Sequence, residues 1–282
     1  MMYWIYDYPS GLIAILFVAV FIAMTWIGIF LTRATVHSWI HRKTRANEMV
    51  GLALSSFFVL FGLLLGLLAI ATYQNYSNVT DMIDKEASSI AALDRDFSGF
   101  PQPVRGQLQD RLREYARFTI EDGWPQQRKG IAPIGGTERI TALFQVLSTF
   151  EPTKKSEEIF HAEALRQFNN LIELRRTRLA NVLLGLPPVF WRVVAFGALM
   201  STVLIWLQDM EIHVHLILGG ILASIIGALI FLIAMLDNPF RGGVGVGPDP
   251  IALVYATSMK PDGDGAASVD AHQQRSPSSA PQ

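Results

Sequence analysis

The chain contains no cysteine. Disulfide bonds, thiolate metal sites and cysteine nucleophiles are therefore excluded. A strong charge of either sign is also lacking, because 23 Lys and Arg stand against 24 Asp and Glu. Proteins that bind nucleic acid normally present a basic face, so we expect no nucleic-acid partner. Only 17% of the residues are charged and 51% are hydrophobic, which is typical of a membrane protein rather than a soluble one.

Recognisable catalytic and metal-binding patterns are missing as well. His213 and His215 are two residues apart, a spacing that points side chains away from each other on a helix. The glycine-rich segment 242–247 lacks the Lys-Ser/Thr ending of a phosphate-binding loop. No serine or histidine stands in a recognisable nucleophile context. The sequence therefore predicts a protein that is not an enzyme and that holds no metal and no cofactor.

Four apolar runs are long enough to cross a membrane. The hydrocarbon core is about 30 Å thick and requires about 20 mostly apolar residues in a helix. The runs are Gly11–Leu31, Met49–Ala71, Val189–Leu207 and His215–Leu236. Gly11–Leu31 is too long for the core of a signal peptide, so we interpret it as a retained span. Three of the four runs contain no Asp, Glu, Lys or Arg. Ion-coupled transporters bury such residues along their transport paths, so the sequence argues against an ion-coupled transporter.

The polar region between the second and third runs shows only helical periodicity. Its apolar residues recur every three or four positions in four amphipathic segments, and no alternating stretch indicates a strand. The predicted fold is an all-α membrane protein with four transmembrane helices and a helical bundle inserted between helices 2 and 3. We expect the first and last helices of the insert to continue the second and third spans. Arg175, Arg176 and Arg178 are interpreted as part of its solvated surface.

These patterns divide the chain into five parts. Residues 1–72 hold the first two spans and a basic connecting loop, residues 73–187 form the extramembrane helical domain, and residues 188–237 hold the last two spans. Residues 238–260 are expected to be extended. The tail, residues 261–282, is rich in Ser, Pro, Gly, Ala and Gln and is expected to be disordered.

The basic residues of the first loop predict the membrane orientation. The loop carries Arg33, Arg42, Lys43 and Arg45, whereas the connection between the third and fourth runs has neither Lys nor Arg. Short basic loops stay in the cytoplasm. We therefore expect a multi-pass protein of a bacterial inner membrane with its helical domain in the periplasm. Arg42, Lys43 and Arg45 would act as topology signals or contact anionic lipid.

The second run contains two stripes of possible functional interest. Gly62 and Gly66 are four residues apart, a spacing that lets membrane helices approach closely. Beside them runs a stripe that is apolar at membrane depth and polar at one end: Phe57, Phe61, Leu64, Leu68, Thr72 and Asn75. In a ring of identical subunits this stripe would line a hydrophobic constriction that gates ions by dewetting. The alternative is that it packs against neighbouring spans or lipid.

Five groups of residues also carry a family likeness. They are Ala71-Thr72-Tyr73-Gln74-Asn75-Tyr76-Ser77; Glu86-Ala87 with Leu93-Asp94-Arg95; Gly123-Trp124-Pro125; His161-Ala162-Glu163-Ala164-Leu165-Arg166; and Asp237-Asn238-Pro239-Phe240-Arg241-Gly242. Together they resemble the bacterial bestrophin-like domain family, membrane proteins named for a distant similarity to bestrophin channels. The resemblance extends from the second run to about Val254.

The resemblance implies a function. Bestrophins are pentameric anion channels whose second span lines a hydrophobic neck, so the stripe from Phe57 to Asn75 would face the pore. They differ from the present expectation in placing their insert in the cytosol, and the acidic calcium site of animal bestrophins has no evident counterpart here. The leading hypothesis is a homo-oligomeric ion channel, with copies of itself, membrane lipid and inorganic ions as its partners. The alternative is a non-conducting membrane-anchored sensor or scaffold whose helical domain binds a partner.

Overall fold

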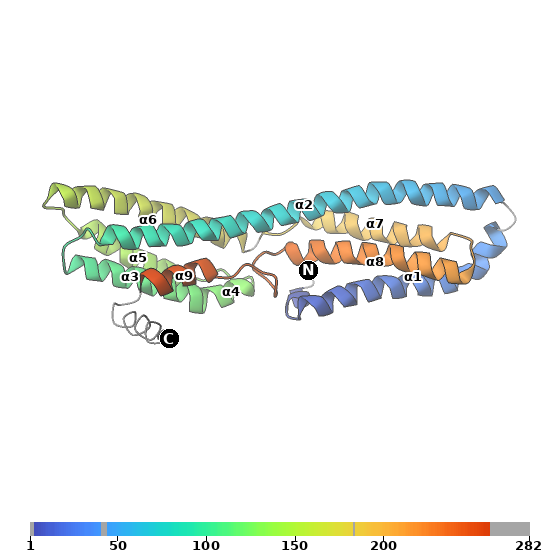
Figure 1. The fold of residues 1–282 in the computed structure, drawn as a ribbon, viewed down its shortest axis with the longest axis horizontal. Coiled ribbons are helices and arrows are strands. Elements are labelled where there is room, and N and C mark those ends of the chain that lie inside the picture. The colour runs from blue at the N-terminus through green and yellow to red at the C-terminus, as the bar shows by residue number, and fades with distance from the viewer. Residues whose placement is uncertain (1–2, 41–43, 183, 260–282) are drawn as a thin grey trace, which may run out of the picture. The chain divides into compact units, whose positions relative to one another are not determined.

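The computed structural model describes residues 3–40, 44–182 and 184–259, and within these ranges it contains helices and no strands (Figure 1). Arg42 and Lys43, and the tail predicted to be disordered, lie outside the described residues. The helices of ten or more residues are α1 (Ser10–Ile40), α2 (Thr44–Phe97), α3 (Val104–Phe118), α5 (Gly135–Thr149), α6 (Lys155–Asn181), α7 (Pro188–Trp206), α8 (Ile212–Leu236) and α9 (Asp249–Ser258). The shorter ones are η1 (Tyr3–Tyr6), η2 (Thr119–Gly123) and α4 (Trp124–Arg128).

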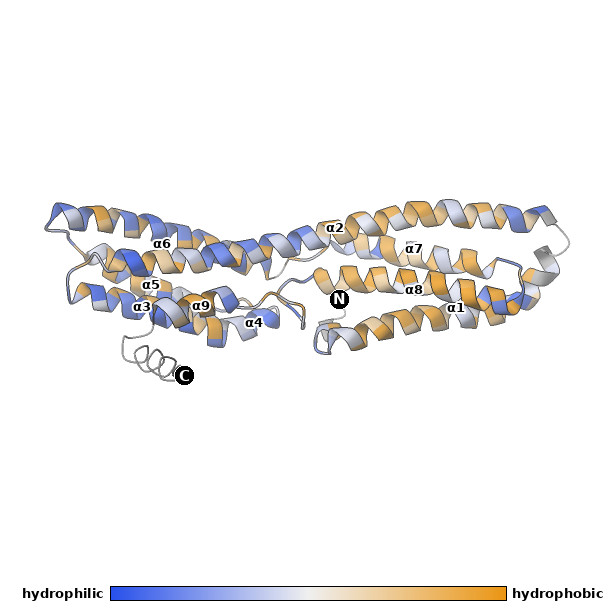
Figure 2. Ribbon diagram, in the orientation of Figure 1, coloured by the Kyte–Doolittle hydropathy of each residue, from blue (hydrophilic) through white to orange (hydrophobic). Residues whose placement is uncertain are grey.

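Four helices are long and apolar enough to span a membrane: α1, α2, α7 and α8. They coincide with the four predicted runs, and Figure 2 shows that α1, α7, α8 and the N-terminal part of α2 are predominantly hydrophobic. The all-helical fold with four membrane-spanning helices is confirmed. The helices α3, α5 and α6 carry mixed polar and apolar residues instead (Figure 2).

Of the two predicted continuations of a membrane span into the polar region, one is found and the other is not. The second span does continue into the polar region, because α2 is unbroken from Thr44 to Phe97. The matching prediction for the third span is wrong, because α6 ends at Asn181 and α7 begins at Pro188. Pro187 and Pro188 explain the break, since proline suits the first turn of a helix but has no N–H to continue one.

The chain forms two compact units. Of the described residues, those up to 79 and those from 184 to 246 form the membrane unit, and residues 80–182 and 247–259 form the polar unit. In the membrane unit α1 packs along α8, and Gly227 lets the two backbones approach, since a Cβ there would lie 3.1 Å from the Cα of Val18. Gly197 on α7 similarly makes room for the ring of Phe61 on α2, which a Cβ would approach to 2.2 Å.

The polar unit is a helical bundle in which α3 contacts α5 and α9. Helix α9 corrects the prediction that residues 238–260 are extended throughout. Pro250 lies in its first turn, where proline is tolerated. Ile251 is fully buried, and the backbone carbonyl of Met259 accepts a hydrogen bond from Nε of Arg113 on α3. These tertiary contacts stabilise a helix of ten residues that would be marginal in isolation.

Candidate pore face and buried ion pair

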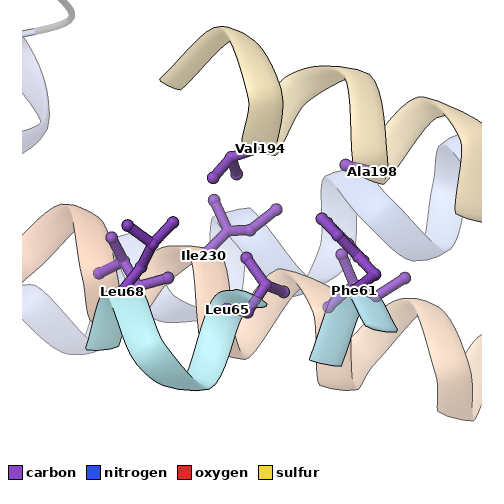
Figure 3. Close-up of a cluster of buried hydrophobic side chains, with 8 residues drawn as sticks. Phe61, Leu65, Leu68, Val194, Ala198 and Ile230 are labelled. Carbon is purple, nitrogen blue, oxygen red and sulfur yellow. The ribbon is translucent and has the colours of Figure 1, made fainter. Parts of the chain in front are cut away.

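One face of α2 is buried inside the membrane unit. Phe61, Leu65 and Leu68 pack against α7 and α8 in a hydrophobic cluster, which Figure 3 shows in close-up. The partners from those two helices are Val194, Ala198, Ile226, Ile230 and Ile233. The cluster fixes which side of α2 faces the rest of its own chain.

Three residues of the predicted pore stripe are buried within the single chain. Phe61, Leu68 and Thr72 are 5%, 6% and 3% exposed within a single chain. The hydroxyl of Thr72 donates back to the carbonyl of Leu68, as buried threonines in helices do. The pore role of these three residues stays a prediction. Phe57 and Leu64 are half-buried against the same cluster.

The opposite face of α2 is apolar and uncovered. Leu63, Leu67 and Ile70 are 61%, 58% and 55% exposed, and Leu60 beside them is 68% exposed. In the most apolar 18-residue stretch of α2 only 17% of the residues are buried. An exposed apolar surface of this extent must meet lipid, another chain or a dewetted pore. We call Leu60, Leu63, Leu67 and Ile70 the outward face of α2.

Polar residues lie on the same side of α2 towards each end of this face. Ser56 precedes Leu63 by two helical turns, Gln74 follows Ile70 by about one turn, and both side chains are exposed. Asn75, the last residue of the predicted stripe, is half-buried. Its pore role, like those of Phe57 and Leu64, stays a prediction.

The glycine pair of α2 does not pack within the chain. Apart from the adjoining backbone of α2, no atom of the described residues lies within 4 Å of the position that a Cβ would take at Gly62 or Gly66. Both glycines border the outward face, so a neighbouring helix of another chain is free to approach them. The intermolecular role of this pair is a proposal, developed below.

The start of α2 is held to the connection between α7 and α8. Asn47 Nδ2 donates to the carbonyl of Asp209, and the Asp209 N–H donates to Asn47 Oδ1, each over 3.0 Å. Nearby, His215 is buried and its Nε2 lies 2.9 Å from the carbonyl oxygen of Ile205, while His213 is exposed. No group of His, Cys, Asp or Glu among the described residues is arranged to hold a metal ion.

The polar unit encloses an ion pair that the sequence does not reveal. Arg178 on α6 donates through Nε and Nη2 to the two carboxylate oxygens of Glu86 on α2, over 2.6 and 2.9 Å. Tyr115 Oη donates to Glu86 over 3.0 Å, and Arg178 Nη1 donates to Oε1 of Gln127 over 2.7 Å. The guanidinium also lies 5.3 Å from the ring centre of Trp124. Four helices thus meet at one pair of charges.

Arg178 is therefore a core residue, which corrects its interpretation as part of a solvated basic face. It is 2% exposed and Glu86 is 0% exposed. Burial disfavours the charge on Arg178, but the adjacent Glu86 carboxylate outweighs this and raises the pKa of the guanidinium above its usual value. Burial, reinforced by the charge of Glu86, also raises the pKa of the Tyr115 hydroxyl. At neutral pH Tyr115 therefore stays a neutral donor.

A π-helical turn, η2, sets the position of two members of this cluster. It joins α3 to α4 and is followed at once by Trp124 and Pro125. Trp124 and Gln127 are buried, whereas Pro125 and Arg128 on the other side of the short helix are exposed. Wide turns of this kind insert one extra residue into a helix and often re-aim side chains at special sites.

Solved structures of a bacterial bestrophin homologue share the fold of this chain. A variant of a bacterial bestrophin homologue from Klebsiella pneumoniae aligns with a TM-score of 0.63 and 10% identity, covering 88% of this chain and 99% of that one. A second variant aligns with a TM-score of 0.62 and 12% identity, covering 86% and 96%. At this identity the likeness shows the fold alone.

The chain was also compared with curated proteins and with models of protein families. No curated protein matches the chain. The family model of the bestrophin-like domain matches residues 19–251, which include most of α1, all of the helices α2 to α8 and the start of α9. The chain belongs to the bestrophin-like domain family.

Proposed function

We propose that the protein is a homo-oligomeric ion channel, with five subunits arranged so that the outward face of α2 lines a central pore. The observation that carries this proposal is the uncovered apolar face of Leu60, Leu63, Leu67 and Ile70, flanked by Ser56 and Gln74. Membership of the bestrophin-like family favours a channel over an enzyme. The resemblance to bestrophins supplies the subunit number and the use of the second span.

The chemistry of the outward face suggests how such a pore would gate. A ring of leucine and isoleucine side chains offers no group to replace the hydration shell of an ion, so a narrow ring empties of water and blocks conduction. Widening or wetting the ring opens it. A neutral ring does not choose the sign of the ion, so anion selectivity follows from the bestrophin resemblance rather than from these residues.

Gly62 and Gly66 fit the contact between neighbouring subunits. They border the outward face and leave the α2 backbone accessible, because no other helix of the described chain lies within 4 Å of their Cβ positions. Small residues at such spacing let membrane helices pack closely, where dispersion rather than the hydrophobic effect drives association. Phe57, Leu64 and Asn75, which keep part of their surface, would lie at the edges of this contact.

The direct test is the current across a planar bilayer that contains the purified full-length protein under a KCl gradient. We expect discrete currents with a reversal potential displaced from zero towards that of chloride, and an oligomer mass of five chains in mild detergent. A stable monomer or dimer would contradict the proposal, because two copies of α2 cannot close a ring. A pentamer that stays silent even after Leu63 and Leu67 are shortened would favour the scaffold alternative.

We also propose a bacterial inner-membrane location with the polar unit on the periplasmic side. The basic residues Arg33 and Arg45, together with Arg42 and Lys43, support this orientation, while the bestrophin resemblance implies the reverse. A reporter enzyme that is active only in the periplasm, fused after Lys260, is expected to be active. Activity of a cytoplasmic reporter at the same point would reverse the orientation without affecting the channel proposal.

A further inference from the structure

The membrane unit contains a cavity of about 630 Å³ that the proposed pore does not use. Its walls come from three helices: Phe17 and Phe21 of α1, Val194 and Ala198 of α7, and Ile230 and Ala234 of α8. Ala195 also lines it, and this side chain is exposed, so the cavity is accessible from outside the chain. Its volume lies within the range of about 300–1,000 Å³ that is typical of small-molecule sites.

One end of the cavity is polar and is built around Asp237. The residue follows α8 directly and is 3% exposed. Asp237 Oδ1 accepts from the backbone N–H of Leu186, and Oδ2 accepts from Trp191 Nε1 over 3.2 Å. Asn238 and Tyr6, which are hydrogen-bonded to each other over 2.9 Å, also line this end. The remaining walls are hydrocarbon.

The carboxylate of Asp237 has neutral donors but no cation. No Lys or Arg among the described residues forms an ion pair with it. Burial raises the pKa of Asp237, while the hydrogen bonds from Leu186 and Trp191 act in the opposite direction. A buried carboxylate normally has a cationic partner or a metal. The cavity at Asp237 therefore favours a ligand that carries a positive charge.

The position of the cavity along the helices indicates the rest of the ligand. Asp237 lies where α8 ends, and Trp191 lies in the first turn of α7, next to Pro188. Trp and Tyr at the ends of spans mark the membrane–water interface. From there the walls run along α7 from Trp191 to Ala198, about 10 Å at 1.5 Å per residue, into the apolar part of the span. The polar end thus matches headgroup depth and the apolar part matches acyl-chain depth.

We propose that this cavity binds a membrane phospholipid with a primary ammonium headgroup, its ammonium at Asp237 and one acyl chain between α1, α7 and α8. A primary ammonium supplies both the missing charge and N–H donors for the carboxylate. An anionic headgroup would be repelled by Asp237. The proposal does not depend on conduction, because no residue of α2, and so none of its outward face, lines the cavity.

The test is retention of defined lipids by the full-length protein, measured by native mass spectrometry. The detergent-purified protein is equilibrated with equal amounts of dioleoyl phosphatidylethanolamine and dioleoyl phosphatidylglycerol. We expect wild type to prefer the ethanolamine lipid by about tenfold, the size of a charge-assisted hydrogen bond. Asp237→Asn, which keeps the shape but removes the charge, should bring the ratio close to one.

A second pair of variants tests the cavity without touching the Asp237 hydrogen bonds. Ala195→Phe should fill the opening of the cavity. Because the lipid then no longer reaches Asp237, the amount of ethanolamine lipid retained should fall by about tenfold, the factor expected for the charge-assisted hydrogen bond. Ala228→Phe on α8 is the matched control, because Ala228 is also exposed but does not line the cavity. It should behave as wild type.

Three results would overturn the proposal. Equal retention of the two lipids by wild type would remove the role of the charge. Unchanged retention in Ala195→Phe would place the bound lipid elsewhere. A loss of oligomer mass in Ala195→Phe, with lipid retention unchanged, would assign the cavity to a neighbouring copy of the chain instead.

Discussion

Replacing Arg178 with alanine is expected to destabilise the polar unit by about 3–5 kcal/mol, the usual result of removing one partner of a buried ion pair. The loss is large because Glu86 would remain with 0% exposure and without a countercharge. Its carboxylate would either stay charged in an apolar setting or take up a proton. Oε1 of Gln127 would lose its donor as well.

The measurement is thermal unfolding of the detergent-solubilised protein, read by intrinsic fluorescence and by limited proteolysis. Arg111→Ala serves as the control, since the Arg111–Glu114 pair is 50% and 43% exposed and should contribute at most about 1 kcal/mol. Combining Arg178→Met with Glu86→Leu should cost less than the two single changes added together, because neither charge is then left alone. Additive effects, or an Arg178→Ala protein as stable as the control, would contradict the role of the pair.

Shortening the outward face of α2 is expected to raise the current at least several-fold. Leu63→Ala combined with Leu67→Ala removes apolar side chains from the proposed constriction, which widens it and favours its hydration. Both residues are more than half exposed in the single chain, so their truncation should cost little folding stability. The measurement is open probability and conductance in planar bilayers at matched protein density.

Phe61→Ala provides the contrast on the same helix. Phe61 is 5% exposed and packs over Gly197, so its loss should destabilise the membrane unit by about 3–5 kcal/mol. It should lower the yield of assembled protein without enlarging single-channel conductance. If Phe61→Ala raised conductance and the double leucine variant did not, the original stripe would be the lining and the outward face would meet lipid.

The sequence predicted the elements of the membrane unit but not the rotation of α2 about its axis. Apolar runs of sufficient length identify spans, and the predicted bounds of α7 and α8 agree with the structure to within a few residues. The other two helices run on past the predicted ends of their spans, α1 to Ile40 and α2 to Phe97. Within a run that is apolar on every side, however, periodicity carries no information about which face is inside. Leu65, the most deeply buried α2 residue of the hydrophobic cluster at 1% exposure, is chemically the same as Leu63 at 61%. The faces are distinguished by their partners on α7 and α8, among them Gly197, which makes room for the ring of Phe61.

The buried ion pair shows a second kind of limit. Glu86 and Arg178 are 92 residues apart, and each stands among other charged residues, so the sequence indicates no pairing. The motif residues Glu86 and Trp124 did carry the family resemblance, and the structure brings them to one site. Their convergence became visible only when four helices were placed in space. Similarly, α9 depends on contacts with α3 that a local pattern does not contain.

The contact between Phe61 and Gly197 has a consequence for the proposed pore. A side chain at position 197 would collide with the phenyl ring, so either the ring would take another rotamer or α2 would turn away from α7 to accommodate it. Such a turn carries Leu63 and Leu67 to new angles around the pore axis. The diameter of the pore would then be set from behind the lining helix, by a residue that never contacts a permeating ion. Substitutions at position 197 would retune conductance while every pore-lining side chain stays the same.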